Sequence, residues 1–249
     1  MFPGWQVRVW DGAAARSQLE ATDRELGLTL ARDFDGAQQL AVKADIARYS
    51  ILYTHGGLYV DADLECLRPF AHFLHPTKPT AMMRNLYDAI EKQHLSHTNN
   101  SIFCMPLPRS GAARDMLVHM SKLPLPQTTK AVLEYGGPKA LYDILTGHDV
   151  QWVPSDMFEP IQIHTMNVYG VRGDRARAMF PFAYTIHSYG MSWVNSTGRR
   201  ILMTLAKSTA LIIQQRTVLV FVLLALLLVF VPVCAVFIAL WAQGKTRGT

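Results

Sequence analysis

The stretch HGGLYVDADLECL, residues 55–67, decides the fold of this chain. It opens with Gly56 and Gly57, which suit the end of a helix, and continues with alternating apolar and polar residues, as along a half-buried strand. The alternation predicts one strand with Asp61 and Asp63 on the same face. A rise of ~3.3 Å per residue sets their Cα atoms about 6–7 Å apart. One hydrated cation fits between two carboxylates at that spacing.

The pair formed by Asp61 and Asp63 suits a hard divalent ion. Mg²⁺ and Mn²⁺ take oxygen ligands and can keep coordination positions open for substrate phosphates. Asp-X-Asp also arises by chance, and an acidic spot at the end of an ordinary strand is then the commoner explanation. The pair by itself therefore leaves metal binding as the minority interpretation, and the surrounding sequence has to decide.

A helix is predicted just before this strand, over residues 37–54. Apolar residues recur at spacings of four, three and four, which predicts the face that packs on the core: Leu40, Ala44, Ala47 and Ile51. Asp45 and Arg48 lie one turn apart on a different face. They form either a surface pair worth ~0.2–0.5 kcal/mol or a pair that holds parts of a nucleotide sugar.

Strands and helices are expected to alternate along the chain, which favours an α/β domain. Strands are predicted at residues 5–10, 101–106, 150–153 and 183–187, with loops over most of residues 76–110. Helices are predicted at residues 111–122 and 128–133. A further helix is expected after Gly136 and Gly137, because Pro138 suits a first helical position.

The C-terminal part of the sequence is strongly apolar. Residues 217–241, TVLVFVLLALLLVFVPVCAVFIALW, carry no charge over 25 residues, and about 20 suffice to cross the hydrocarbon layer of a membrane. We expect a transmembrane helix there, kinked at Pro232, rather than a buried core helix. The predicted organisation is a main domain at 1–198, an amphipathic membrane-proximal segment at 199–216, this span, and a polar tail at 242–249.

Charge and cysteine content exclude some classes of protein. The net charge is +5, but Lys and Arg are dispersed without basic runs, so nucleic acid is not an expected partner. The three cysteines, Cys66, Cys104 and Cys234, lack metal-ligand spacing. A disulfide between Cys66 and Cys104 and a pair of free thiols are the alternatives.

Residues 43–70, KADIARYSILYTHGGLYVDADLECLRPF, resemble the central motif of the DXD-containing sugar transferases. This family includes fungal α-1,6-mannosyltransferases and inositol-phosphorylceramide mannosyltransferases, with clostridial glucosylating toxins as more distant members. The shared pattern is Ala-Asp-X-X-Arg-Tyr, then Leu-Tyr, then Gly-Gly-X-Tyr-X-Asp-X-Asp, with a proline after the strand. Similar segments occur in family order: WQVRVWDG, NNSIFCMP, YGGPKAL and IHSYGMSW. The resemblance covers residues 5–195 and implies a GT-A fold, a nucleotide-sugar-binding α/β sandwich with the DXD strand at its centre.

The resemblance also implies roles for individual residues. Asp61 and Asp63 would be the catalytic pair that binds Mn²⁺ or Mg²⁺, and His187 would complete the metal site. On composition alone, His187 would more often be an ordinary core or surface histidine. The nucleotide-sugar donor would be bound by four further residues: Asp45, Arg48, Asn100 and Trp193. No general base can be named from the sequence.

The implied activity is a metal-dependent glycosyl transfer with retention of anomeric configuration. Because a membrane span suits a lipid acceptor, the favoured substrates are GDP-mannose and a membrane sphingolipid such as inositol phosphorylceramide. Transfer to glycoprotein glycans and a non-catalytic, membrane-anchored scaffold derived from this fold are the alternatives. A regulatory or homo-oligomeric membrane partner is compatible with each of them. An Asp-X-Asp phosphatase would need Thr or Val at position 65, where this chain has Glu65.

Two observations bear on location, and they point in opposite directions. Glycosylation acceptor patterns begin at Asn99 and Asn195, and together with the resemblance they favour a domain in the Golgi lumen. Basic residues are more frequent before the predicted span than after it, which weakly favours the cytosol. We expect a single-pass Golgi membrane protein with a lumenal catalytic domain.

Overall fold

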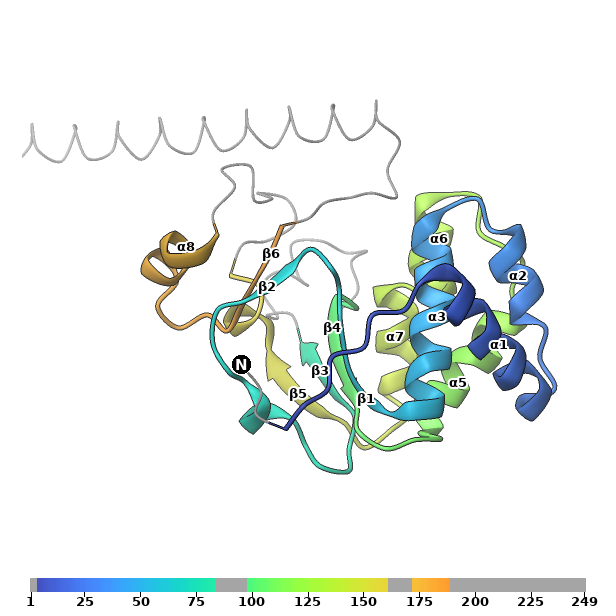
Figure 1. Cartoon of the computed structure of the whole chain (residues 1–249), viewed down its shortest axis with the longest axis horizontal. Coiled ribbons are helices and arrows are strands. Elements are labelled where there is room, and N and C mark those ends of the chain that lie inside the picture. The colour runs from blue at the N-terminus through green and yellow to red at the C-terminus, as the bar shows by residue number, and fades with distance from the viewer. Residues whose placement is uncertain (1–3, 84–97, 161–171, 189–249) are drawn as a thin grey trace, which may run out of the picture. The chain divides into compact units, whose positions relative to one another are not determined.

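The computed structural model describes residues 4–83, 98–160 and 172–188, and its elements belong to one compact unit, Met1–Ser196 (Figure 1). Trp193 and the three predicted segments from residue 199 onward lie outside the described residues. The domain division at residue 198 and the transmembrane helix therefore stay predictions. Within the described part of the chain, no helix is both long and apolar enough to cross a membrane.

A four-stranded mixed sheet forms the centre of this unit. Its strands run in the order β1 (Gly57–Val60), β4 (Ile102–Met105), β3 (Thr80–Met83) and β5 (Gln151–Pro154). β4 is antiparallel to both neighbours, whereas β3 and β5 are parallel. A separate antiparallel pair is formed by β2 (Leu64–Cys66) and β6 (Thr185–His187). The chain therefore passes from one sheet to the other between β1 and β2.

Six of the described helices gather on one side of the larger sheet, as Figure 1 shows. They are α1 (Gly12–Leu26), α2 (Leu30–Gly36), α3 (Leu40–His55), α5 (Gly111–Ser121), α6 (Thr129–Tyr135) and α7 (Pro138–Leu145). α3 packs against α1, α2, α5 and α6 and leads directly into β1. The remaining described elements are α8 (Gly173–Met179) and the short 3₁₀ helices η1 (Ala71–Phe73) and η2 (Ser155–Met157).

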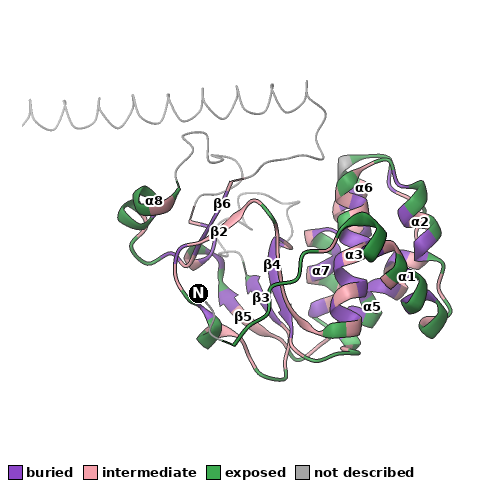
Figure 2. Ribbon diagram, viewed as in Figure 1, coloured by how far each residue is buried: buried purple, intermediate pink, exposed green. Residues whose placement is uncertain are grey.

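Each face of the larger sheet has its own buried cluster. Phe103 and Met105 of β4 belong to the core shared with the helices. Ile102 of the same strand packs instead with Phe70 and Phe158 beyond the opposite face. β4 is buried along its whole length, which Figure 2 shows in purple. The strand that separates the two clusters is therefore a rigid support for the loop that precedes it, and that loop contains Asn100.

Most predicted elements are confirmed. The helix expected at residues 37–54 is α3, those at 111–122 and 128–133 are α5 and α6, and Pro138 is at the start of α7. The strands expected at residues 101–106, 150–153 and 183–187 are β4, β5 and β6. The mixed α/β architecture fits a GT-A-like fold.

One local prediction is wrong, one missed a short strand, and one pair of alternatives is decided. Residues 5–10 belong to neither sheet, and Val7 and Val9 are exposed, so their alternation does not correspond to a strand. β3 lies within residues 76–110, where loops were expected to dominate. Cys66 and Cys104 are free thiols, which excludes the disulfide alternative.

The predicted buried face of α3 is also wrong. Leu40 is 66% exposed and Ala44 is exposed, whereas Ile46 and Tyr49 are fully buried. α3 carries apolar residues around most of its circumference, so periodicity alone does not single out one face. As a consequence, the side of α3 that carries Asp45 and Arg48 points into the protein.

Candidate functional site

A turn, and not a continuous strand, brings the two aspartates of the DXD motif together. β1 ends at Val60, and the backbone N–H of Asp61 donates to the carbonyl of Ser101 at 2.7 Å. The N–H of Leu64 then donates to the carbonyl of Asp61 at 3.1 Å, which closes a turn over residues 61–64. The prediction of one strand over residues 58–67 is therefore wrong: the motif lies between two strands of different sheets.

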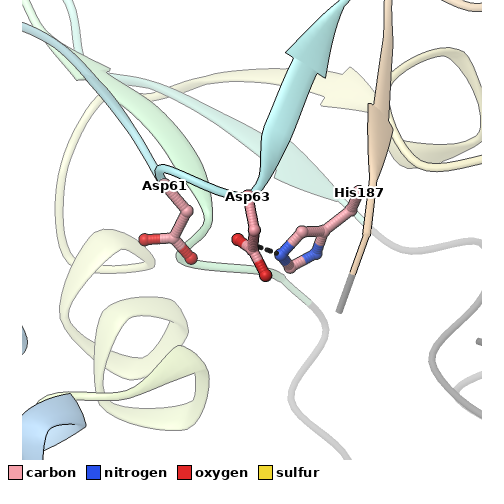
Figure 3. Close-up of side chains that lie close together, drawn as sticks. All are labelled: Asp61, Asp63 and His187. Atoms are coloured by element: carbon pink, nitrogen blue, oxygen red, sulfur yellow. Dashed lines mark hydrogen bonds and ion pairs between the residues drawn. The ribbon is translucent and has the colours of Figure 1, made fainter. Parts of the chain in front are cut away.

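β6 supplies a third candidate ligand from a distant part of the chain. In the β2–β6 ladder, His187 is the partner of Leu64, and the N–H of Ser188 donates to the carbonyl of Asp63 at 2.9 Å. This pairing places the imidazole Nε2 of His187 3.0 Å from Oδ1 of Asp63. Figure 3 shows both aspartates and His187 converging at this turn.

The donor atoms of Asp61, Asp63 and His187 all lie within 4.8 Å of one another. Two carboxylates and one imidazole form a donor set that suits Mn²⁺, since carboxylates bind Mg²⁺ and Mn²⁺ and imidazole prefers transition metals. The side chains of Asp61 and Asp63 are 25% and 35% exposed, so the cluster is open on one side. The geometry thus fits a divalent ion that keeps positions free for a substrate.

The charge of His187 depends on its two acidic neighbours. Burial lowers the pKa of its imidazole, but the hydrogen bonds to Asp63 and Glu159 outweigh burial and raise the pKa to about 9. Without a metal, the ring is therefore cationic at neutral pH and compensates the charges of both carboxylates.

Glu159 lies behind His187 and was not singled out from the sequence. It is 6% exposed, and its Oε1 lies 3.3 Å from Nδ1 of His187. Burial acts to raise the pKa of Glu159, but hydrogen bonds, led by that to His187, outweigh it and lower the pKa, so the carboxyl is ionised at neutral pH. Its position follows η2 in irregular backbone, where no motif or spacing marks it. Only the folded chain shows that it belongs to the site.

Asn99 and Ser101 hold the same carboxylate from the other side. The amide nitrogen of Asn99 donates to Glu159, and the hydroxyl of Ser101 donates to its Oε1 at 2.7 Å. Asn99 is buried. Its amide is therefore occupied inside the protein, and its use as a glycosylation acceptor stays a prediction. Asn195 lies outside the described residues.

Arg48 connects α3 to the DXD turn. Its Nη2 lies 3.1 Å from Oδ1 of Asp45 and 3.6 Å from Oδ1 of Asp61. Its Nη1 donates to the carbonyl of Asn100 at 2.6 Å, and its guanidinium carbon lies 4.3 Å from the ring centroid of Tyr59. The side chains of Arg48 and Asp45 are only 6% and 4% exposed, so the interpretation as a surface pair is wrong.

Asp45 and Asp61 are each held by further contacts. The amide nitrogen of Asn100 donates to Oδ1 of Asp45 at 3.1 Å, and the hydroxyl of Tyr59 donates to Oδ1 of Asp61. Burial raises the pKa of Asp45 to about 7, although Arg48 acts in the opposite direction. The network therefore joins α3, β1 and the loop before β4 around one carboxylate of the metal cluster.

The structure brings together six of the seven residues predicted for the site. Asp61, Asp63 and His187 form a cluster that could hold a metal ion, and Asp45, Arg48 and Asn100 lie beside it in the network around Asp61. Direct contact of these three with a donor stays a prediction. Trp193 lies outside the described residues.

Comparison with known proteins places part of this site in a recognised sequence region. Residues 3–86 match the family model described as "Glycosyltransferase sugar-binding region containing DXD motif". This match confirms the resemblance and includes Asp45, Arg48, Asp61 and Asp63. His187 and Glu159 lie beyond it.

Two curated relatives are similar over parts of their sequences. The first is an uncharacterized glycosyltransferase, L373, of Acanthamoeba polyphaga mimivirus, 37% identical over 71 residues, or 28% of this chain and 27% of the relative. The second is inositol phosphoceramide mannosyltransferase 3 of Schizosaccharomyces pombe, 30% identical over 92 residues, or 34% of this chain and 25% of the relative. The chain thus spans about a quarter of the length of each. No solved structure matches.

Proposed function

We propose that this chain is a metal-dependent glycosyltransferase that moves a sugar from a nucleotide sugar to an acceptor hydroxyl. The observation that carries this proposal is the convergence of Asp61, Asp63 and His187 at a turn within or beside the region that matches the DXD family model. Two carboxylates and a histidine at this spacing are a ligand set for a diphosphate-binding cation.

Asp61, Asp63 and His187 would hold Mn²⁺ or Mg²⁺, which as a Lewis acid stabilises negative charge on the departing nucleoside diphosphate. The residues around them orient the ligands. Arg48 and Tyr59 fix the carboxylate of Asp61 through the contacts described above. Preorganised ligands avoid the cost of reordering side chains when the substrate binds.

The network on α3 is the proposed donor-binding part of the site. Asp45, Arg48 and Asn100 would contact the sugar or ribose of the donor, with Trp193 near the diphosphate. The burial of Asp45 and Arg48 requires that such contact come from the edge of the network that faces Asp61. A donor on this edge would have its diphosphate beside the metal cluster.

The favoured donor is GDP-mannose, and the favoured acceptor is a membrane sphingolipid such as inositol phosphorylceramide. Two observations support this choice: the name of the S. pombe relative, and the uncharged run at residues 217–241, which suits a membrane anchor beside a lipid acceptor. With them we propose retention of anomeric configuration, a single membrane span, and a catalytic domain in the Golgi lumen.

A donor screen tests the activity. The purified chain in detergent is incubated with a panel of nucleotide sugars, with Mn²⁺, Mg²⁺ or a chelator, and release of nucleoside diphosphate is measured. We expect metal-dependent turnover of one donor, reduced at least about 100-fold in Asp63→Asn. Glu65→Gln is the matched control, because Glu65 lies two residues away and bonds to the backbone of Gly173.

An acceptor screen then separates the alternatives. Transfer of radiolabelled mannose from GDP-mannose to inositol phosphorylceramide in a lipid extract supports the favoured pair, whereas labelling of glycoprotein glycans supports the other acceptor class. The enzymatic proposal is abandoned if no nucleotide sugar is turned over with any metal and no acceptor is labelled. A scaffold without catalytic function would give that result.

A further inference from the structure

Glu159 is buried beside the Nδ1 atom of His187, on the edge of the imidazole ring opposite Asp63. The two ring nitrogens of His187 have different neighbours: Nε2 lies 3.0 Å from Asp63, and Nδ1 lies 3.3 Å from Glu159. Asp63 belongs to the open cluster, whereas Glu159 is 6% exposed. The imidazole therefore lies between a carboxylate at the site and a carboxylate in the interior.

The backbone holds Glu159 in this position through contacts with β6 itself. The N–H of Tyr184 donates to the carbonyl of Met157 at 2.7 Å, and the hydroxyl of Thr185 donates to the carbonyl of Phe158. The N–H of Glu159 donates to the carbonyl of Ser155 at 2.6 Å and completes a tight turn after η2. The segment that carries His187 and the turn that carries Glu159 are thus joined directly before each of these residues.

The remaining hydrogen bonds of Glu159 leave it directed at the imidazole. Asn99 and Ser101 both donate to its carboxylate. Two donors on one carboxylate restrict its rotation, so its orientation is fixed before any ligand arrives. Removing this buried carboxylate would leave its hydrogen-bond donors unsatisfied in the interior, which would destabilise the fold.

A metal-bound histidine uses one nitrogen for the ion and commonly donates its other N–H to a carboxylate, which fixes the tautomer and the orientation of the ring. We propose that Glu159 is the positioning residue of the metal site: it accepts the Nδ1–H of His187 and so leaves Nε2 to bind the cation with Asp61 and Asp63. This inference rests on the metal-dependent function proposed above and extends it to a residue outside the matched region.

Mn²⁺ affinity of the full chain, measured by the electron paramagnetic resonance signal of free Mn²⁺, tests this role without substrate. Glu159→Gln removes the charge while keeping a similar shape. We expect it to weaken Mn²⁺ binding about 10- to 100-fold, the range typical for such partners of metal ligands. Glu65→Gln is the matched control and should change the affinity less than about twofold, because the Glu65 carboxylate of the adjacent β2 accepts from the backbone N–H of Gly173 and is opposite Ile186 in the ladder.

A double-mutant cycle distinguishes positioning from a general structural contribution. In a His187→Gln background, Glu159→Gln should weaken Mn²⁺ binding less than about twofold further, because the ligand it acts through is gone. A purely structural role would weaken binding equally in both backgrounds and would overturn the inference. Pulsed measurements add a spectroscopic signature: coupling of ¹⁴N to bound Mn²⁺ should be present in the unaltered chain and reduced in Glu159→Gln.

If Glu159→Gln does not fold, Glu159→Asp provides the same test with the charge retained and the carboxylate withdrawn by one methylene. It should also weaken Mn²⁺ binding, and again only when His187 is present. Normal Mn²⁺ binding by both variants would overturn this inference alone. Absence of Mn²⁺ binding by the unaltered chain would overturn the proposed metal site together with it, so the two failures are distinguishable.

Discussion

The buried guanidinium of Arg48 pairs with the carboxylates of Asp45 and Asp61. Its partners Asp45 and Asp61 lie 3.1 and 3.6 Å away, and its side chain is 6% exposed. A buried ion pair contributes little net stability when it forms, but removing one partner leaves an uncompensated charge in the interior. The residue is therefore hard to replace, whether or not it touches a substrate.

The first prediction concerns Arg48→Met. We expect it to lower the free energy of unfolding by about 3–5 kcal/mol, measured by denaturant titration, because Asp45 loses its partner in the interior. Arg177→Met is a matched control: Arg177 also pairs with an aspartate three residues earlier on a helix, Asp174, but both side chains are exposed. Its cost should be below ~1 kcal/mol. Equal costs for the two variants would contradict the burial of the Arg48 network.

The second prediction concerns pH and His187. Its pKa is about 9 in the folded, metal-free chain against 6.5 for an ordinary histidine, so folding favours the protonated ring. The resulting stabilisation, on the order of 3 kcal/mol, is complete below pH ~6.5 and is lost as the pH rises through about 9. Denaturant unfolding in the presence of a chelator, from pH 6 to pH 9.5, measures it. In His187→Gln this part of the pH dependence should disappear.

At the scale of single residues, motif resemblance predicted more than periodicity did. Asp61, Asp63 and His187 converge as the resemblance implied. Glu159 could not be found, because it follows η2 in irregular backbone and its role depends on a strand elsewhere in the chain. The face of α3 that holds Arg48 was misassigned, since a helix that is apolar on most sides gives no unique direction.

The junction between α3 and β1 depends on one glycine. Gly56 has φ of +66° and ψ of −168°, a conformation that residues with side chains rarely adopt. A Cβ atom there would also lie 2.7 Å from the carbonyl oxygen of Pro106, which is backbone and cannot move alone. This residue therefore permits the close approach of the chain after α3 to the segment after β4.

The third prediction compares two glycines at helix ends. Gly56→Ala should lower the free energy of unfolding by more than about 2 kcal/mol, because strain in φ adds to the clash with backbone. The melting temperature should fall accordingly. Gly27→Ala, at φ +68° but with nothing within 4 Å of the added Cβ, should cost only ~1 kcal/mol. Thermal unfolding of both variants gives the comparison. Similar melting temperatures would exclude the close contact at Pro106.

The alternation of polar and apolar residues predicted most strands, but it did not predict the residue at which each strand ends. Asp61, Ala62 and Asp63 continue the polar–apolar alternation of β1 and β2, so the sequence contains no sign of the turn that separates two sheets there. Residues 5–10 alternate as well and have no ladder partner among the described strands. Strand formation requires a neighbouring strand, which a local pattern does not report.

At the scale of the whole molecule, residues 217–241 are the predicted membrane span. The fourth prediction is that the chain sediments with membranes and resists extraction by high salt or alkaline carbonate, as expected for a hydrophobic segment long enough to span. A chain shortened to residues 1–198 should be recovered in the soluble fraction. Carbonate extraction of the unshortened chain would contradict the predicted span.

The β2–β6 pairing has a consequence for how the chain folds and stays folded. Asp63 and His187 are 124 positions apart in sequence, so their side chains meet only after a very long loop has closed. Closing such a loop is an entropic cost that the unfolded chain does not bear. An ion shared by these two residues, as proposed above, would tie the second half of the chain to the first. Metal binding should therefore also stabilise the pairing of β2 with β6. The metal-free chain should be the form in which β6 detaches most readily.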